Sequence, residues 1–179
     1  MNRKDAGFSL PELAVTLSVL AIILAIALPV FGAMLQGARA SSTYHLLMTS
    51  LAAARLRAIK DNAPVTVCPS TDGYTCRGDE IWNDGWILYL DPDREDQPSS
   101  AEAVIQRFDG VDNGLQLRST ADRIRVRFQP TGWSYGHNLS IRLCRGDGFL
   151  GSVIVNNAGR PRTERQDGSA PCPFTVGTP

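Results

Sequence analysis

The sequence lacks the motifs by which most catalytic centres are recognised. It has no Gly-x-Ser-x-Gly, no closely spaced group of metal ligands and only two histidines, His45 and His137, which lie far apart in the chain. Nucleophilic and metal-assisted catalysis both need such groups close together. We therefore expect no enzyme, no catalytic residues, no bound metal and no cofactor.

Cysteine is scarce, and no two cysteines are separated by only two residues. There are four of them: Cys68, Cys76, Cys144 and Cys172. Zinc sites usually contain closer pairs, so disulfides are favoured, and a zinc site that uses two cysteines and both histidines is the alternative. Three pairings are open. We favour Cys68 with Cys76, which closes a short loop, and Cys144 with Cys172, which fastens a Pro- and Gly-rich tail to a strand.

The chain also lacks a net charge, but its charges are unevenly distributed. Residues 1–60 carry a net charge of +4, residues 61–113 carry −9, and residues 114–179 carry +5. Every basic residue in the last part is arginine, and none is lysine. Arginine suits bidentate recognition of phosphate or carboxylate, although GC-rich coding would produce the same bias.

One long apolar run lies near the N-terminus, from Leu13 to Leu28, after a short basic start. A helix over these residues and their apolar neighbours spans roughly the 30 Å hydrocarbon core of a bilayer. A secretory signal would carry a small-residue cleavage site after the run, and no convincing Ala-x-Ala follows it. The run therefore predicts a membrane-spanning helix. Glu12 lies at its edge, where a carboxylate is costly unless it is paired or neutral.

The pattern after Arg39 predicts an amphipathic continuation of this helix and then an all-β part. Apolar residues recur at helical spacing from Tyr44 to Ala58, and Pro64 marks the end near Asp61. Period-two patterns then predict strands at 65–67, 86–90, 103–108, 114–118, 122–129, 139–143 and 150–155. In 122–129, the three arginines should point away from the apolar side chains. The fold class is α+β, a long N-terminal helix packed on an antiparallel β-sheet head.

The start of the chain resembles a known processing signal. Gly7-Phe8-Ser-Leu-Pro-Glu12 followed by the apolar run is similar to the leader of type IV pilins and of type II secretion pseudopilins. Cys68-Pro-Ser, 82–91, 128–133 and 153–162 resemble the GspH/FimT group of minor pilins and pseudopilins. This resemblance covers nearly the whole chain from Lys4.

The resemblance implies several properties of these residues. It implies a leader over 1–7, cleavage after Gly7, N-methylation of Phe8, and pairing of Glu12 with the N-terminal amine of a neighbouring subunit. It implies a helix over 8–60 and a head over 61–179. The expected partners are major and minor pilins, the prepilin peptidase and the inner-membrane assembly platform. The protein should sit in the inner membrane with its head in the periplasm before it joins a filament.

Two groups of residues have competing interpretations. Tryptophan occurs at three positions, which we interpret as core and turn packing, with a binding platform as the alternative: Trp82, Trp86 and Trp133. Acidic residues cluster in one polar loop, which makes calcium an alternative to a solvated loop: Asp91, Asp93 and Asp96. The loop has neither the turn glycine nor the closing glutamate of an EF-hand.

The segment Gly159-Arg160-Pro161-Arg162, with Arg165, is the main candidate for a binding site. We expect a stiff loop after a strand, from which the arginines project. In the FimT branch a similar segment is associated with DNA binding in natural transformation, which makes double-stranded DNA a candidate partner. Four further arginines would widen the patch if their strands adjoin it: Arg123, Arg125, Arg127 and Arg142. We expect a minor pilin that primes a type IV pilus, with a type II secretion pseudopilin as the alternative.

Overall fold

The computed structural model describes residues 9–111, 114–120 and 123–174, and the chain divides into two compact units. The first unit is Met1–Ser41 and the second is Ser42–Pro179. We call the second the head unit, and it contains every strand together with the last part of the long helix. The expected cleavage site at Gly7 and Phe8 lies outside the described residues.

Helix α1 extends over Leu10–Asp61 and continues through Pro29. Glu12 lies in its first turn and Lys60 in its last, which is the charge order that the helix dipole favours. The helix ends as expected from the sequence, because Asn62 adopts a positive φ of 50° and Pro64 follows. By length and composition α1 can cross a membrane, with a mean hydropathy of 2.7 in its most apolar window.

The first sheet of the head unit is antiparallel, with the strand order β3-β2-β1-β5. Its strands are β1 (Val65–Pro69), β2 (Gly85–Leu90), β3 (Val104–Asp109) and β5 (Val126–Phe128). A single 3-10 turn, η1 (Ala101–Ala103), leads into β3. Strands β1 and β2 are buried along almost their whole length, and Thr66 is the polar exception in two otherwise apolar or aromatic sequences.

The second sheet is also antiparallel and has the order β4-β6-β7-β8. Its strands are β4 (Leu115–Ser119), β6 (Leu139–Arg145), β7 (Gly148–Val155) and β8 (Pro161–Arg165). Strand β8 corrects the sequence-based expectation of a loop after 155. Proline is tolerated at the first residue of an edge strand, and Pro161 occupies that position.

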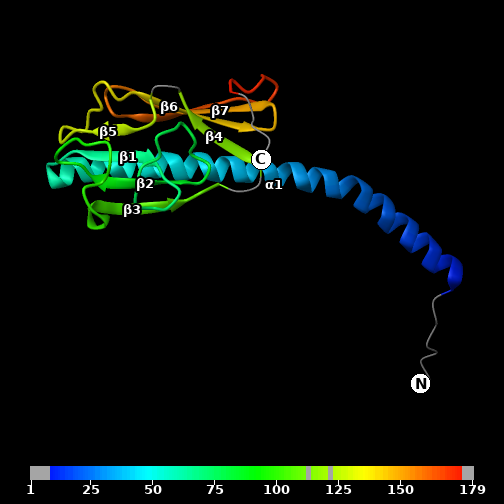
Figure 1. The fold of residues 1–179 in the computed structure, drawn as a ribbon. Coiled ribbons are helices and arrows are strands. Elements are labelled where there is room, and N and C mark those ends of the chain that lie inside the picture. The colour runs from blue at the N-terminus through cyan, green and yellow to red at the C-terminus, as the bar shows by residue number, and fades with distance from the viewer. Residues whose placement is uncertain (1–8, 112–113, 121–122, 175–179) are drawn as a thin grey trace. The chain divides into compact units, whose positions relative to one another are not determined.

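Within the head unit the second part of α1 supplies the central element of the core. Leu47, Leu51, Ala54 and Ala58 are at most 1% exposed and lie on one helical face. Figure 1 shows the strands of both sheets grouped along this part of the helix. The indole nitrogen of Trp86 on β2 donates to the hydroxyl of Ser50 at 3.0 Å, so helix and sheet are also joined by a buried hydrogen bond.

Strand β5 differs from the expected alternation, because all three of its residues are buried. Arg127 does not point to solvent: its Nε donates to Asp91 Oδ2 at 2.6 Å, and its Nη2 donates to the carbonyl of Glu95 at 2.8 Å. Thr66 also donates to Asp91 Oδ2, at 2.6 Å. The carboxylate of Asp91 compensates the buried guanidinium, which period-two patterning alone does not reveal.

Two carboxylates of the acidic loop contact neighbouring groups of the protein. Asp91 Oδ1 accepts from the backbone N–H of Glu95, and its other oxygen is taken by Arg127 and Thr66. Asp96 forms an ion pair with Arg125. In the described part of the chain, no three His, Cys, Asp or Glu residues come together as metal ligands.

Two disulfides join the pairs that the sequence favoured. Cys68 is bonded to Cys76, and Cys144 is bonded to Cys172. The four sulfurs are therefore not available to bind zinc. The second disulfide holds the C-terminal tail against the β6–β7 hairpin, where the N–H of Cys172 also donates to the Asp147 carbonyl at 2.7 Å.

The buried ion pair predicts a large stability effect. Asp91→Asn leaves the Arg127 guanidinium buried without its counter-charge, and we expect it to lower the free energy of unfolding by about 3–5 kcal/mol. Asp93→Asn, an exposed neighbour in the same loop, is the control and should change stability by less than about 0.5 kcal/mol. Urea unfolding with both disulfides intact measures this. Equal stability of the two variants would contradict the assignment.

Candidate functional site

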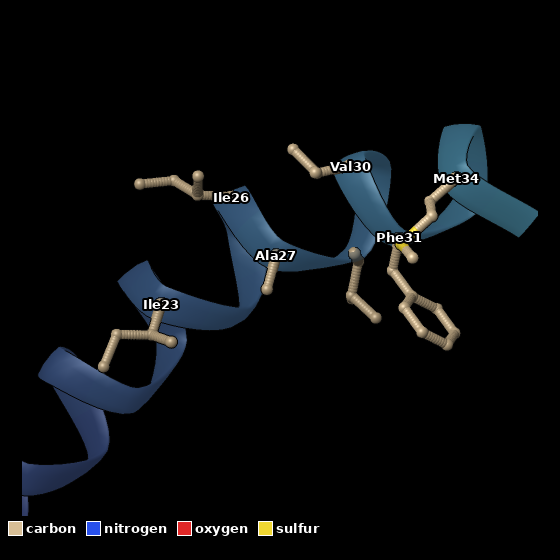
Figure 2. Close-up of a pocket in the computed structure, with 7 residues that line it drawn as sticks. Ile23, Ile26, Ala27, Val30, Phe31 and Met34 are labelled. Carbon is tan, nitrogen blue, oxygen red and sulfur yellow. The ribbon is translucent and has the colours of Figure 1, made fainter.

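The first candidate site is the apolar surface of α1 in the first unit. Every large apolar side chain from Leu10 to Leu35 is exposed, and Leu35, the least exposed, still shows 42% of its surface. Figure 2 shows Ile23, Ile26, Val30 and Phe31 projecting outward from different sides of the helix. A helix that is apolar on all sides must be surrounded by lipid or by other apolar helices. This surface is therefore suited to membrane anchoring and to helix packing.

Glu12 is the acidic residue of this apolar stretch, and it is exposed in the first helical turn. The backbone N–H of Leu13 donates to the Ser9 carbonyl at 3.1 Å, which is a helical hydrogen bond that spans Glu12. Glu12 therefore lies in the first hydrogen-bonded turn of the helix. The positive end of the helix dipole favours a carboxylate there. In an apolar environment Glu12 would still need a cation as a partner.

The second candidate site is the arginine segment, and it begins at a tightly packed turn. Gly159 is buried with φ +69°, and its N–H donates to the Asn156 carbonyl at 2.8 Å. A Cβ atom added at Gly159 would lie 2.0 Å from the carbonyl oxygen of Gly132. The next residue, Arg160, donates its backbone N–H to Asn156 Oδ1 at 3.1 Å. The backbone that precedes the arginines is thus held in place.

The pairing of β8 with β7 puts the arginines of this segment on different faces. Arg162 lies opposite Ile154, and Arg165 lies opposite Gly151. Because side chains alternate along a strand, Arg162 and Arg165 point to opposite sides of the sheet. The guanidinium of Arg165 lies 5.4 Å from the ring centroid of Tyr44 on α1. Arg165 is therefore engaged in packing on the helix side, where burial raises the pKa of Tyr44 to about 12.

The other face of this sheet carries arginine side chains, of which Arg162 is exposed and Arg142 is half-buried. Arg162 is exposed and forms an ion pair with Glu164 at 3.0 Å, which is a weak interaction at a surface. Arg142 on β6 lies opposite Ser152, two residues from Ile154 on β7, so it shares this face with Arg162. The side chains of Arg142 and Arg160 make no hydrogen bond or ion pair with another residue of the described chain. We call Arg142 and Arg162, together with the exposed Arg160 that immediately precedes β8, the arginine face.

The three remaining arginines that were considered for the patch are occupied elsewhere. Arg123 donates to the Gly136 carbonyl at 2.7 Å and to Asn138 Oδ1 at 2.5 Å. Arg125 pairs with Asp96, and Arg127 is buried against Asp91. The structure therefore adds Arg142 to the candidate site and separates the other three from it.

The tryptophans divide into two groups. Trp82 and Trp86 are buried in the core, as expected, and Trp86 stacks on Phe108 at 5.5 Å between centroids. Trp133 is 41% exposed, and its ring stacks on that of Tyr135 at 4.7 Å. Sequence analysis did not single out Tyr135. The signal was its position, two residues from Trp133 in a loop between two glycines.

Comparison with known proteins shows to which family the chain belongs. A family model described as Type II transport protein GspH matches residues 44–159. The chain belongs to this family. The prokaryotic N-terminal methylation motif matches residues 2–28. No curated protein matches the sequence significantly.

The fold resembles that of solved structures. Two crystal forms of the type IV minor pilin FimU of Pseudomonas aeruginosa strain PAO1 match, with TM-scores of 0.53 and 0.55. The first form is 19% identical to this chain, and the match covers 69% of this chain and 91% of the FimU chain. The second form is 16% identical, and the match covers 74% of this chain and 92% of the FimU chain. The type IV pilin fold expected from the sequence is confirmed.

These findings place the chain among the pilin-like subunits. It is a minor pilin or pseudopilin of the type IV pilus and type II secretion family, which consists of structural subunits and not of enzymes. Its apolar helix and methylation motif indicate a membrane anchor and assembly with other pilins. The family match ends at Gly159, so Arg160 and β8 lie beyond it.

The close contact at Gly159 predicts a sharp difference between two glycine substitutions. Gly159 and Gly136 both have positive φ, +69° and +70°, but only Gly159 faces backbone within 4 Å. We expect Gly136→Ala to cost about 1 kcal/mol from backbone strain alone, and Gly159→Ala to cost at least about 2 kcal/mol more. Thermal unfolding of the two variants measures the difference, and equal melting temperatures would exclude the proposed close packing.

Proposed function

We propose that this protein is a minor pilin that primes the assembly of a type IV pilus and lies at or near its tip. The observation that carries the proposal is the exposure of every large apolar side chain between Leu10 and Leu35, since such side chains need partners in lipid or in a filament. The fold is similar to that of a type IV minor pilin, which is consistent with this proposal, while the family model is described as a type II transport protein, so the secretion pseudopilin is kept as the alternative.

We further propose how the N-terminus takes part. Cleavage after Gly7 exposes the amine of Phe8, which is then methylated, and the methylation motif that matches residues 2–28 supports this step. The amine becomes the cation that pairs with Glu12 of a neighbouring subunit. This pairing allows a carboxylate to enter the apolar core of a filament, with the head on the periplasmic side of the inner membrane before assembly.

The pairing predicts a defect that is specific to assembly. Glu12→Ala should leave the protein in the membrane fraction but reduce its incorporation into sheared pili at least roughly tenfold, since a charge pair in an apolar setting is lost. Thr16→Val, a change one turn further along the helix, should be incorporated normally. Immunoblots of membranes and sheared pili measure both. Normal incorporation of Glu12→Ala would refute the pairing.

Deletion of the gene distinguishes a role in a type IV pilus from a role in a type II secretion system. Reduced piliation and twitching, restored by the wild-type gene, would support the type IV pilus. Normal piliation with a loss of secreted proteins from the medium would refute it and support the alternative, a pseudopilin of a type II secretion system.

A specific observation favours a second function, the binding of DNA. Arg142 and Arg162 share one face of the second sheet, the exposed Arg160 comes directly before β8, and the side chains of Arg142 and Arg160 make no hydrogen bond or ion pair within the described chain. Arginine binds phosphate through two parallel hydrogen bonds, and DNA is a polyanion that a surface filament can meet. We propose that the arginine face contacts DNA phosphates without reading sequence.

Binding measurements on the full-length protein in detergent micelles test this function. Arg160→Ala with Arg162→Ala should weaken binding to a 30-base-pair duplex roughly tenfold and reduce the slope of log K against log salt by about 0.9 for each lost phosphate contact. A control that removes the same charge, Arg57→Ala with Arg94→Ala, should have little effect. Fluorescence anisotropy gives both quantities. If both double variants lost the same amount of DNA affinity, the loss would come from the change in overall charge, and the proposed site would be refuted.

A further inference from the structure

An exposed aromatic pair lies in the loop that joins β5 to β6. Trp133 is 41% exposed and Tyr135 is 58% exposed, and their rings are stacked at 4.7 Å with an angle of 12° between planes. Each ring covers one face of the other, so the solvent-exposed surface includes the remaining faces and edges. Tyrosine and tryptophan rings that are stacked together and left exposed offer apolar contact area to a ligand.

The loop that carries this pair is held rigidly. The N–H of Gln129 donates to the Trp133 carbonyl at 2.8 Å, and that of His137 donates to the Ser134 carbonyl at 2.9 Å. Ser134, between the two rings, is fully buried. Its backbone N–H donates to the Asn157 carbonyl at 2.9 Å, and its hydroxyl donates to the Asn156 carbonyl at 2.8 Å. A rigid platform loses little conformational entropy when it binds.

The same contacts place the aromatic pair beside the start of the arginine segment. Asn156, which accepts from the Ser134 hydroxyl through its carbonyl, also accepts the backbone N–H of Arg160 through its side chain. Gly132, next to Trp133, is packed against Gly159, next to Arg160. The loop that carries Trp133 and Tyr135 is therefore fixed to the backbone segment that ends in the exposed Arg160.

The charge of these segments favours a negatively charged ligand with flat rings. Residues 129–138 and 156–160 contain no aspartate or glutamate. Burial, together with nearby arginines, lowers the pKa of His137, so its imidazole is neutral at pH 7 and the positive charge of these two segments comes from Arg160. A neutral sugar could accept hydrogen bonds from Arg160, but only an anionic ligand would also gain from its charge. A nucleic acid with unpaired bases uses both groups, because bases stack on aromatic rings while phosphates bind arginine.

We propose that Trp133 and Tyr135 form a base-stacking platform for single-stranded DNA, with Arg160 binding the adjacent phosphate. This proposal rests on the proposed DNA binding and deepens it. The aromatic platform would give the protein a preference for unpaired bases, which the arginine face alone would not give. Paired bases within a duplex are already stacked and have no free ring face to offer.

The test uses the full-length protein in detergent micelles with two probes, a 20-nucleotide oligothymidine and a 20-base-pair duplex. Since Trp82 and Trp86 are at most 1% exposed, quenching of tryptophan fluorescence by the oligothymidine should come from Trp133. Trp133→Ala and Tyr135→Ala should each weaken oligothymidine binding between about five- and a hundredfold and leave duplex binding within twofold. Tyr74→Ala, which removes a 48%-exposed ring elsewhere in the head unit, should change neither.

The outcomes separate this platform from the arginine face. If Arg160→Ala with Arg162→Ala weakens duplex binding but Trp133→Ala and Tyr135→Ala leave oligothymidine binding unchanged, the platform is wrong and the proposed DNA contact stands. If the protein binds neither probe, both proposals fail. Quenching by a neutral hexasaccharide at concentrations where oligothymidine has no effect would assign the rings to carbohydrate and overturn the platform.

Discussion

The core of the head unit depends on one face of α1, whose side chains are buried from water and include two alanines. Leu47 and Leu51 fill space, while Ala54 and Ala58 further along the helix are fully buried small residues. The helix also supplies polar anchors on this side: Ser50 binds Trp86, and Arg55 donates to the Gly132 carbonyl at 3.0 Å. This last bond fixes the loop that carries Trp133, so the helix indirectly positions the candidate binding surface.

Local patterns predicted most of the fold, because helix and strand periods depend on neighbouring residues. The helix, its end near Asp61, the positions of most strands and the two disulfides were all accessible from the sequence. The exceptions are contacts between distant segments. Arg127 is buried because Asp91, 36 residues away, compensates its charge, and no periodicity reports such a pair. Strand β8 was missed for a related reason, since an edge strand that is not buried shows no apolar period.

The candidate site was predicted in part. Gly159, Arg160 and Arg162 were identified from their order along the chain, but which face a side chain occupies depends on strand register. Register places Arg165 against Tyr44 and brings Arg142 onto the face of Arg162. The aromatic pair is a further example, because an exposed tryptophan and a buried one have the same sequence signature in an irregular loop. Assembly, by contrast, involves a single continuous segment, which is why it was the easiest property to infer.

Strand β8 lies at the rim of its sheet, and none of its five residues is buried. The family match stops at Gly159, just before the strand begins. A segment in this position can change sequence while the shared core stays intact, since it contributes backbone pairing to one neighbour and little packing. The buried core of the head unit therefore consists of α1, the other strands and the loops between them, while β8 adds a short rim whose exposed side chains face whatever surrounds the subunit.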